Sequence, residues 1–416
     1  MNEEVRFEKI TEFLTQYENI WRYEILETYP NHLLPYDRKW IDELSKMSDE
    51  QLYQIDIKGS SKDITNTSFK DYLNTIMDLS YVEYEEIPEE IKYPSWAFHK
   101  VKQKKVHEIQ VISHLLKKIE NVSGFKKVVD IGGGVGHMSR TLAHYHGIPC
   151  ISLDINKDFQ DIGKKRLQKF PLPKNANKVE FITHDFSKNL NESLTKKIFS
   201  KDSFSIGLHT CGPLANHHLD IHLKERTSGI LNFGCCYNRL NPSLDVNLSQ
   251  KAKKNPINFS DFSLTLSARG HDSMDIEDFK FKKRVKYYRY GLHLVLTELL
   301  KRNDIYAVGD SHKRYYEMSF PDYIHHKLSE LEIEHQLNKE ELQQFYNDQE
   351  IILRDMFLAN IIRWQLGRVL ELHILLDRVL YLRENGVKAT IRRYFHSHLS
   401  PRNIGILSYG RTNESK

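Results

Sequence analysis

Residues 128–144, VVDIGGGVGHMSRTLAH, combine three patterns that together allow few folds. Val128, Val129 and Ile131 form a short apolar run typical of a buried β-strand, and the residues after Gly136 suit a helix. Between them, glycines let the backbone turn tightly and approach a ligand where a Cβ would collide. The start of the helix offers free backbone N–H groups. This segment predicts a strand, a ligand-binding loop and a helix.

The same alternation of strand and helix patterns continues along the chain. Short apolar runs separated by helix-like stretches favour an open parallel α/β sheet whose strands are buried on both faces. The runs are KKVVDIGG, IPCISLDI, VEFITHDF, FSIGLHTC and SGILNFGCC, followed much later by KATIRRYF and NIGILSYG. Between the two groups the pattern is helical, with long helices predicted at about 273–303 and 340–384. We predict a Rossmann-like α/β sheet with a helical insertion before its last two strands.

Four segments follow from these patterns. We predict an N-terminal helical region over 1–98 and a cofactor-binding Rossmann-like core over 99–240. A helical insertion over 241–386 is a candidate substrate region, and residues 387–416 close the core sheet.

Composition narrows the class of protein. Of 416 residues, 40% are apolar and 28% charged, which is typical of a globular domain. The formal net charge of +4 neither requires nor excludes a nucleic-acid partner. The start, MNEEVRFEKI, lacks a secretory h-region, and no apolar run is long enough to span a membrane. With only four cysteines, we predict a soluble cytoplasmic protein with reduced thiols and no membrane partner; its oligomeric state stays open.

The spacing of the glycine loop indicates which ligand it holds. Asp130, Gly132, Gly134 and Gly136 form Asp-x-Gly-x-Gly-x-Gly, whereas the dinucleotide fingerprint requires glycine at the position of His137. The mismatch favours S-adenosyl-L-methionine over NAD. Asp130 would accommodate the ammonium of the methionine portion, directly or through water. A tight turn without any ligand is the alternative.

Two further strand ends extend the predicted pocket. Asp154 ends the second strand, about twenty residues after the loop, where a carboxylate accepts ribose hydroxyls. Asp185 ends the third strand, placed to accept from the adenine amino group, with Phe186 beside the ring. Singly, each acid is equally well explained as a solvated strand-end residue. Together with Asp130 they lie where open α/β sheets bind ligands.

The fourth and fifth strand ends carry candidate catalytic residues. His209 is the candidate base and a cofactor contact, because imidazole titrates near neutral pH, and Cys211 accompanies it. Three interpretations of Cys211, Cys235 and Cys236 remain open. They are small buried residues, zinc ligands together with His209, or a redox or nucleophilic cysteine. We predict no metal, because C-x-x-C spacing is missing.

Two basic stretches suggest an RNA partner. FKFKKRVKYYRYGLH interleaves six cations with aromatic rings, the combination that flexible RNA requires, and HKVKQKKVH (99–107) precedes the cofactor loop. The alternative for the first stretch is a helix with solvated lysines and buried tyrosines. The cations and rings of that stretch are Lys280, Lys282, Lys283, Arg284, Lys286 and Arg289, with Phe279, Phe281, Tyr287, Tyr288 and Tyr290.

Six motifs give the chain a family resemblance over roughly residues 95–410. They are KKVHE (104–108), VVDIGGGVGHMSR, GLHTCGPL, NFGCCY, HILLDRVLYLRENG and LSPRNIGIL. The chain resembles the methyltransferase-like 25 family, also called the ribosomal RNA adenine dimethylase domain-containing family. It is more distantly similar to tRNA 2′-O-methyltransferases of the acceptor stem. The resemblance implies a class I methyltransferase core with cofactor contacts at Asp130, Gly132, Gly134, Asp154 and Asp185.

The chain also departs from the family pattern. Pro213 replaces the acid usual after HTCG, and Asn238 follows Cys-Cys-Tyr where histidine is common, so substrate preference does not transfer directly. The sequence predicts an S-adenosylmethionine-dependent methyltransferase with RNA, either tRNA or rRNA, as the favoured acceptor. The alternatives are a protein or small-molecule acceptor, or a non-catalytic module that binds RNA or a partner.

Overall fold

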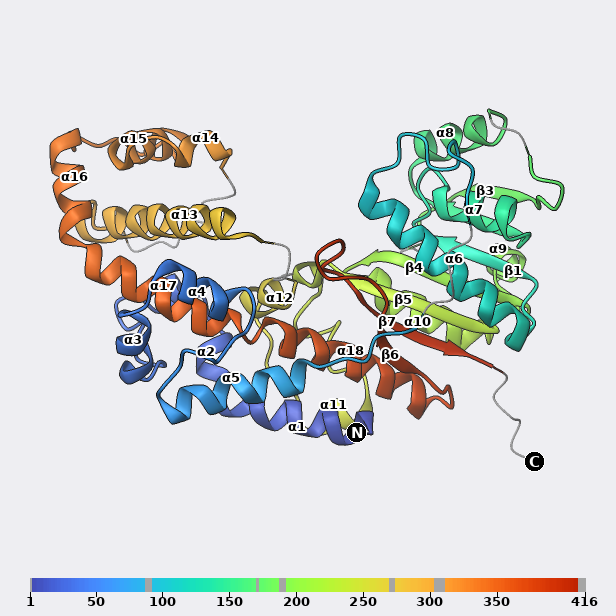
Figure 1. Ribbon diagram of the computed structural model, residues 1–416, viewed down its shortest axis with the longest axis horizontal. Helices are drawn as coiled ribbons and strands as arrows, with labels where there is room; N and C mark the ends of the chain where they lie inside the picture. Colours follow the sequence, from blue (N-terminus) through green and yellow to red (C-terminus); the bar gives the residue numbers. More distant parts are fainter. Residues whose placement is uncertain are drawn as a thin grey trace. The chain divides into compact units, whose positions relative to one another are not determined.

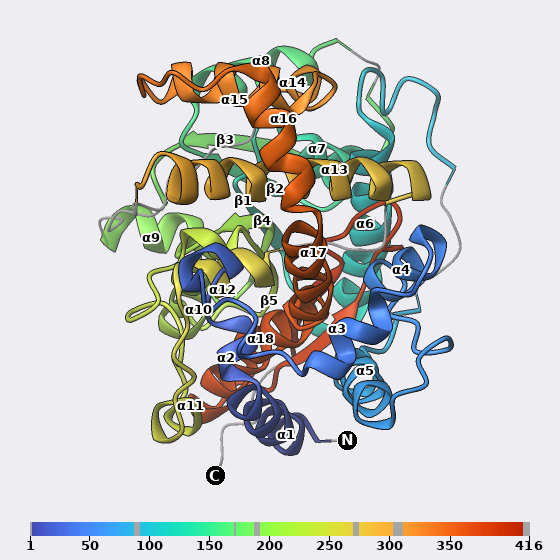
Figure 2. The same ribbon diagram turned by 90° about the vertical axis from the view of Figure 1, so that its left-hand side faces the viewer.

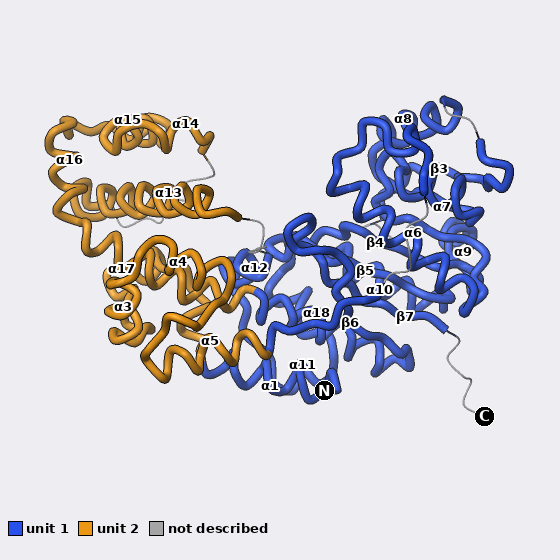
Figure 3. Tube along the Cα trace, viewed as in Figure 1, with its two compact units in different colours: residues 1–16, 79–273, 368–416 blue, residues 17–78, 274–367 orange. Residues whose placement is uncertain are grey.

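The computed structural model describes residues 2–86, 92–169, 172–186, 192–268, 274–302 and 311–410. The chain forms two compact units, drawn blue and orange in Figure 3. The first consists of residues 1–16, 79–273 and 368–416, and the second of residues 17–78 and 274–367. The four segments predicted along the chain do not coincide with these units, since the predicted N-terminal region contributes to both.

The first unit contains a seven-stranded sheet in the order β3-β2-β1-β4-β5-β7-β6 (Figure 1). The strands β1 to β5 pair in parallel, and β7 runs antiparallel to both β5 and β6. The predicted fold class is confirmed. The strands are β1 Lys127–Ile131, β2 Cys150–Asp154, β3 Val179–Thr183, β4 Ser203–Cys211, β5 Gly229–Cys235, β6 Thr390–Arg393 and β7 Ile404–Tyr409.

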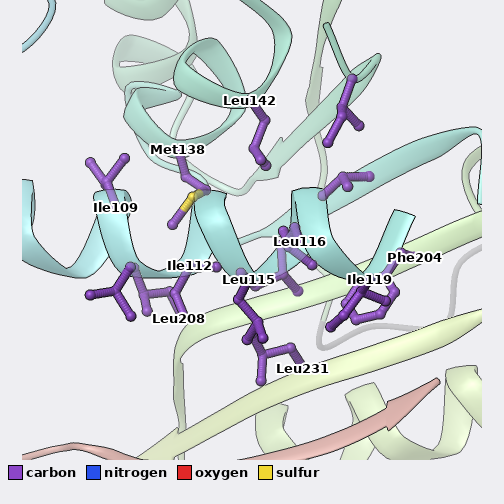
Figure 4. Packing of buried hydrophobic residues seen from close by; sticks show 14 of the residues in the cluster. Ile109, Ile112, Leu115, Leu116, Ile119, Met138, Leu142, Phe204, Leu208 and Leu231 are labelled. Atoms are coloured by element: carbon purple, nitrogen blue, oxygen red, sulfur yellow. The ribbon is translucent and has the colours of Figure 1, made fainter. Parts of the chain in front are cut away.

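Helices cover both faces of the central strands because alternate side chains of a strand point to opposite faces. Helix α6 (Gln103–Ser123) packs its apolar side chains on Phe204 and Leu208 of β4 and on Leu231 of β5 (Figure 4). Helix α10 (Leu214–Glu225) packs against the same two strands. There the buried His218 pairs its Nε2 with Ser205 Oγ at 2.9 Å. The sheet is therefore the middle layer of this unit.

The strand order reverses beside β1, and this determines where a ligand can bind. The chain runs from β1 outward through β2 to β3, and then returns to place β4 on the other side of β1. At such a switch point, successive connections leave toward opposite faces and open a crevice at the carboxyl ends of the strands. The edge formed by the ends of β1, β2 and β4 is the expected binding edge.

The remaining helices belong partly to the first unit and partly to the second, and Figure 2 shows the same elements from a second direction. In chain order they are α1 Glu3–Gln16, α2 Glu18–Trp21, η1 Ile25–Thr28, α3 Arg38–Leu44, α4 Asp49–Asp56, α5 Thr67–Ser80, α7 His137–Tyr145, α8 Lys157–Leu167, α9 Glu192–Ile198, η2 Tyr237–Arg239, α11 Gln250–Lys254, α12 Asp261–Ser267, α13 Ile276–Leu294, η3 Val295–Leu299, α14 Lys313–Tyr316, α15 Phe320–Glu330, α16 Lys339–Asp348, α17 Glu350–Trp364 and α18 Gly367–Glu384. Within the described part of the chain, none of these helices combines the length and apolar character needed to span a lipid bilayer.

The single helix predicted near 340–384 is wrong, because three helices occupy this stretch. Turns at Gln349 and at residues 365–366 separate α16, α17 and α18. Burial explains why the apolar sequence pattern does not indicate where one helix ends and the next begins. Helix α17 is buried at nearly every position from Leu353 to Trp364, and α18 begins within a similarly buried stretch, so the apolar pattern runs through the turn without interruption.

Candidate active site

The glycine loop after β1 has the conformation that only glycine adopts easily. Gly132 and Gly134 have φ values of +70° and +57°, and a Cβ built on either would meet no heavy atom within 4 Å. The space beside these two residues is therefore open. Gly136 differs: it precedes α7 with φ +69°, and its Cβ would lie 2.7 Å from the ring of Phe181. Gly136 thus packs against Phe181 beneath the loop, and its predicted cofactor contact stays a prediction.

Asp130 supports the loop from inside the protein. Its side chain is buried, and Oδ2 accepts a hydrogen bond of 2.8 Å from Ser139 Oγ in α7. Burial raises the pKa of the Asp130 carboxyl to about 6, although the Ser139 bond and the charge of Lys105 act in the opposite direction. Asp130 thus ties the strand to the helix and puts a titratable carboxyl under the open space.

Asp154, at the end of β2, connects the loop to the second strand. Its Oδ2 accepts from the backbone N–H of Gly134 at 2.8 Å, and its Oδ1 accepts from the N–H of Asn156 at 2.8 Å. The residue is half-buried. A carboxylate has about four lone-pair positions, so two remain for ligand hydroxyls. The geometry is compatible with the predicted ribose contact, which stays a prediction.

Asp185 and Phe186 follow the third strand but differ in their surroundings. The half-buried Asp185 lies two residues beyond the end of β3. Phe186 is part of the core, with its ring centroid 5.7 Å from that of Phe199 and 5.0 Å from that of His217. Its predicted place beside an adenine ring would need one edge of this buried ring to face the pocket.

His209, the predicted base, pairs with a carboxylate that the sequence analysis did not single out. Its Nε2 lies 3.3 Å from Glu108 Oε2 of α6, and the other oxygen, Oε1, accepts from Ser400 Oγ at 2.8 Å. Glu108 is only 1% exposed. Burial acts to raise its pKa, but bonding to His209, the charge of Lys105 and the Ser400 bond together hold it below the ordinary value.

Lys105 is a second missed residue. It is the third residue of α6, and its Nζ lies 4.0 Å from Glu108 Oε2. Desolvation lowers the pKa of Lys105, although the carboxylates of Glu108 and Asp130 both act to raise it. One ammonium therefore interacts with the residue behind the base and with the residue under the glycine loop. The motifs KKVHE and LSPRNIGIL contained these residues, but their spacing in sequence carried no signal of contact.

The three clustered cysteines lie at the ends of β4 and β5. Cys211 Sγ lies 3.4 Å from Cys235 Sγ and 3.4 Å from Cys236 Sγ, and all three are free thiols. Burial raises the pKa of the Cys211 and Cys235 thiols. The raised pKa of Cys211 disfavours a nucleophilic thiolate at this position.

The first basic stretch forms most of α13, and several of its lysines form ion pairs within the second unit. Lys282 pairs with Asp56, Lys283 with Asp49 at 2.7 Å, and Lys286 lies 3.8 Å from Glu24. The rings of Phe279, Tyr288 and Tyr290 are buried. These contacts fit the structural alternative for α13, with the lysines in internal ion pairs instead of solvated.

Comparisons with known proteins agree with this geometry over part of the chain. Residues 101–243 match a family model described as "Methyltransferase domain". The chain is 24% identical over 224 residues to "Probable methyltransferase-like protein 25" of Homo sapiens, and 22% identical over 225 residues to that of Mus musculus. Each match covers 50% of this chain and 37% of the relative.

A structural match is also found, to the crystal structure of coclaurine N-methyltransferase bound to N-methylheliamine and SAH. It covers 98% of this chain and 94% of that chain, with 11% identity and a TM-score of 0.25, a likeness too low to support an argument. The distant similarity to methyltransferase-like 25 is confirmed, whereas the relation to tRNA enzymes stays a prediction. Residues 101–243 are a methyltransferase domain, and its cofactor is S-adenosyl-L-methionine.

Proposed function

We propose that this chain transfers the methyl group of S-adenosyl-L-methionine to a nucleotide of an RNA. The observation that carries the proposal is the position of the His209–Glu108 pair beside the glycine loop, bridged by Lys105. A cofactor site and a candidate base thereby lie at one edge of the sheet. When bound, the cofactor supplies an electrophilic methyl group on a sulfonium.

Glu108 determines how His209 acts. If Nε2–H of His209 donates to the Glu108 carboxylate, the lone pair lies on Nδ1, which then accepts the proton of an acceptor hydroxyl or amine. The buried carboxylate also stabilises the imidazolium that results. Glu108 is thus a positioning residue, which is itself held by Ser400. The cofactor residues of the proposal are Asp130, Gly132, Gly134, Asp154, Asp185 and Lys105.

Cations and exposed rings beside this edge support an RNA acceptor. Lys100, Lys102 and Lys104 are exposed just before or within the first turn of α6. The exposed His396 stacks on the ring of Tyr84 at 5.5 Å and on that of His398 at 5.6 Å. Cations that meet phosphates and flat rings that meet bases are what single-stranded RNA requires.

These rings are linked to the candidate base through α6. His396 also stacks on His107, the neighbour of Glu108 in sequence, with ring centroids 5.6 Å apart. Since Ser400 of the same connection between β6 and β7 bonds Glu108, the stacked rings lie beside the His209–Glu108 pair. An acceptor base resting on them would bring its nucleotide close to His209.

The first experiment is calorimetric titration of the chain with S-adenosyl-L-methionine, in wild type and in Asp154→Ala. We expect binding that weakens about 10–100-fold in the variant, since each hydrogen bond to a charged group contributes about 1.5–3 kcal/mol. No binding at millimolar cofactor would contradict the proposal. The matched control is Asp158→Ala, at an exposed position in the first turn of α8.

The second experiment identifies the acceptor. Total RNA and total protein from cells lacking the gene are incubated separately with the enzyme and tritiated cofactor. We expect label in nuclease-sensitive material. Label in protein or in small molecules would move the acceptor to another class, and cofactor binding without any label would indicate a non-catalytic module. A cytoplasmic location, which we also propose, is tested by fractionation with a tagged chain.

A further inference from the structure

Three sulfur atoms converge at one point of the first unit. The Sγ atoms of Cys211, Cys235 and Cys236 all lie within 4.8 Å of one another. Cys211 and Cys235 are register partners on neighbouring parallel strands, which places their side chains side by side. Among the described residues, no other group of histidine, cysteine and acidic side chains meets this distance.

The backbone at Cys236 explains how two adjacent cysteines reach the same place. In an extended strand, consecutive side chains point to opposite faces, so Cys235 and Cys236 would diverge. Instead Cys236 has φ 51° and ψ 48°, a left-handed conformation that non-glycine residues rarely adopt. This turn brings both Sγ atoms to 3.4 Å from that of Cys211. Although Cys235 and Cys236 are adjacent in sequence and lack C-x-x-C spacing, both can therefore bind one ion together with Cys211.

We propose that Cys211, Cys235 and Cys236 form a three-thiolate site for Zn²⁺. Zinc–sulfur bonds of about 2.3 Å put tetrahedral sulfur ligands about 3.8 Å apart, a value between the 3.4 Å contacts and the 4.8 Å limit of the cluster. His209 is not a ligand in this site, since neither of its ring nitrogens joins the three sulfur atoms within the 4.8 Å limit of the cluster. The ligand set thus differs from the histidine–cysteine set considered from the sequence.

The charges around the cluster favour an anionic metal–thiolate group. Three thiolates and one Zn²⁺ carry a net charge of −1. Arg378 is 1% exposed, and it interacts electrostatically with Tyr237, Asp377 and Asp245 and, more weakly, with Cys235. Neither Nη1 nor Nη2 of Arg378 has a hydrogen-bond partner among the described residues. Arg239 interacts in the same way with Cys211. A buried guanidinium without a full set of partners is costly, and a nearby negative group offsets that cost.

The number of ligands indicates the kind of zinc site. Structural zinc is closed by four protein ligands, whereas catalytic zinc has three and leaves one position for water or substrate. Cys211 and Cys236 are half-buried, and the cluster has three members among the described residues, which matches the ligand number of an open site. Binding displaces one proton from each thiol, which makes uptake dependent on pH. The proposal concerns metal binding alone and does not depend on methyl transfer.

The test uses the full chain purified under reducing conditions. Metal analysis by mass spectrometry should find a single zinc per chain. Replacing zinc with Co²⁺ should give sulfur-to-cobalt charge-transfer absorption in the near ultraviolet and the strong visible bands of a tetrahedral ion. No charge-transfer absorption in the wild-type chain, copper in place of zinc, or a disulfide among these cysteines in the intact mass would each overturn the proposal.

Variants assign the ligands. Cys211→Ser, Cys235→Ser and Cys236→Ser should each weaken Co²⁺ binding about 10-fold or more, since even changes in residues that only support ligands cost about 10–100-fold. Cys150→Ala is the matched control, because Cys150 is the fourth cysteine and bonds the carbonyl of Ile148 away from the cluster. Equal loss in the control would contradict the assignment. Cofactor titration of the same variants separates this outcome from failure of the methyltransferase proposal.

Discussion

The two halves of the candidate site are built over different distances in the sequence. On the cofactor side, Asp130 bonds Ser139 nine residues away, and Asp154 bonds Gly134 twenty residues away. On the acceptor side, Glu108 meets His209 across 101 residues and Ser400 across 292. A short segment can therefore form most of the first half, whereas the second exists only when the whole sheet has formed. Substitutions on the acceptor side should therefore lower turnover, whereas substitutions on the cofactor side should lower cofactor affinity or stability.

The largest expected effect is on the acceptor side. His209→Ala removes the proposed base and should lower kcat about 10²–10⁴-fold, while the dissociation constant of the cofactor stays within about 2-fold. Glu108→Gln should lower kcat less and should shift the pH profile of kcat, since the amide no longer stabilises the imidazolium. Steady-state kinetics and calorimetry check both variants. An equal loss of cofactor affinity would show that the two halves are not separable.

A second pair of variants compares two glycines of the loop. Gly136→Ala should destabilise the fold by about 2–4 kcal/mol, the sum of a left-handed non-glycine residue and an overpacked contact with Phe181. The ring has no room to move, because a Cβ on Gly163 would also lie 2.5 Å from it. A Cβ at Gly132 would face open space, so Gly132→Ala should cost only about 1–2 kcal/mol of stability. The same variant should weaken cofactor binding.

Urea unfolding and cofactor titration measure the two effects. If Gly136→Ala leaves stability unchanged, the packing role assigned to Gly136 is contradicted. If Gly136→Ala instead weakens cofactor binding as much as Gly132→Ala does, the predicted cofactor contact of Gly136 is supported.

This comparison also explains what could be predicted from the sequence. The cofactor half depends on residues close together in the chain, so the glycine spacing and Asp154 were recognisable, as was the order of strands and helices. Glu108 and Ser400 lie within the family motifs KKVHE and LSPRNIGIL, but nothing in a single sequence connects two positions 292 residues apart. Phe186 packs in the core, and its predicted contact with the adenine ring stays a prediction. A ring after a strand can face either the core or the pocket, and pattern alone does not distinguish these.

The helical parts were predicted less well for a different reason. Helix α17 is buried on almost all sides, so the apolar pattern continued into α18 and concealed the turn at residues 365–366. In α13, the cations suggested an RNA surface, yet Lys282 and Lys283 find their partners in α4, more than two hundred residues earlier. Charge clusters indicate a partner but do not distinguish a ligand from the chain itself.

A third prediction uses the pH dependence of Asp130. Since burial raises its pKa to about 6 in the folded chain, above the ordinary 3.8, its stabilising contribution is present below about pH 4 and lost as pH rises through about 6. Asp130→Asn keeps an acceptor for Ser139 without the charge. The variant should therefore be about 2–3 kcal/mol more stable than wild type at pH 7.5 without cofactor.

The difference between Asp130→Asn and wild type should shrink toward pH 4. Urea unfolding at several pH values checks it, and Asp158→Asn, at an exposed site, is the control. A variant that is less stable at every pH would contradict this prediction. It would mean that a positive charge, such as that of Lys105, offsets the cost of burying the Asp130 carboxylate in the folded chain.

The smallest expected effect belongs to Lys105, the residue that joins the two halves. Its side chain is 37% exposed, and ion pairs at such positions contribute about 0.2–1 kcal/mol. Lys105→Met keeps the apolar part of the side chain. It should weaken cofactor binding about 2–5-fold if the Lys105 ammonium contacts the carboxylate in the methionine portion of the cofactor. Lys104→Met, one position earlier and 47% exposed, should change little. S-adenosyl-L-methionine and 5′-methylthioadenosine, which lacks the amino-acid group, separate the causes: only the first should lose affinity in Lys105→Met. Equal losses of affinity for both ligands would show that Lys105 does not contact the amino-acid group of the cofactor. Lys105 would then act through the His209–Glu108 pair, and only the glycine loop and its acids would bind the cofactor.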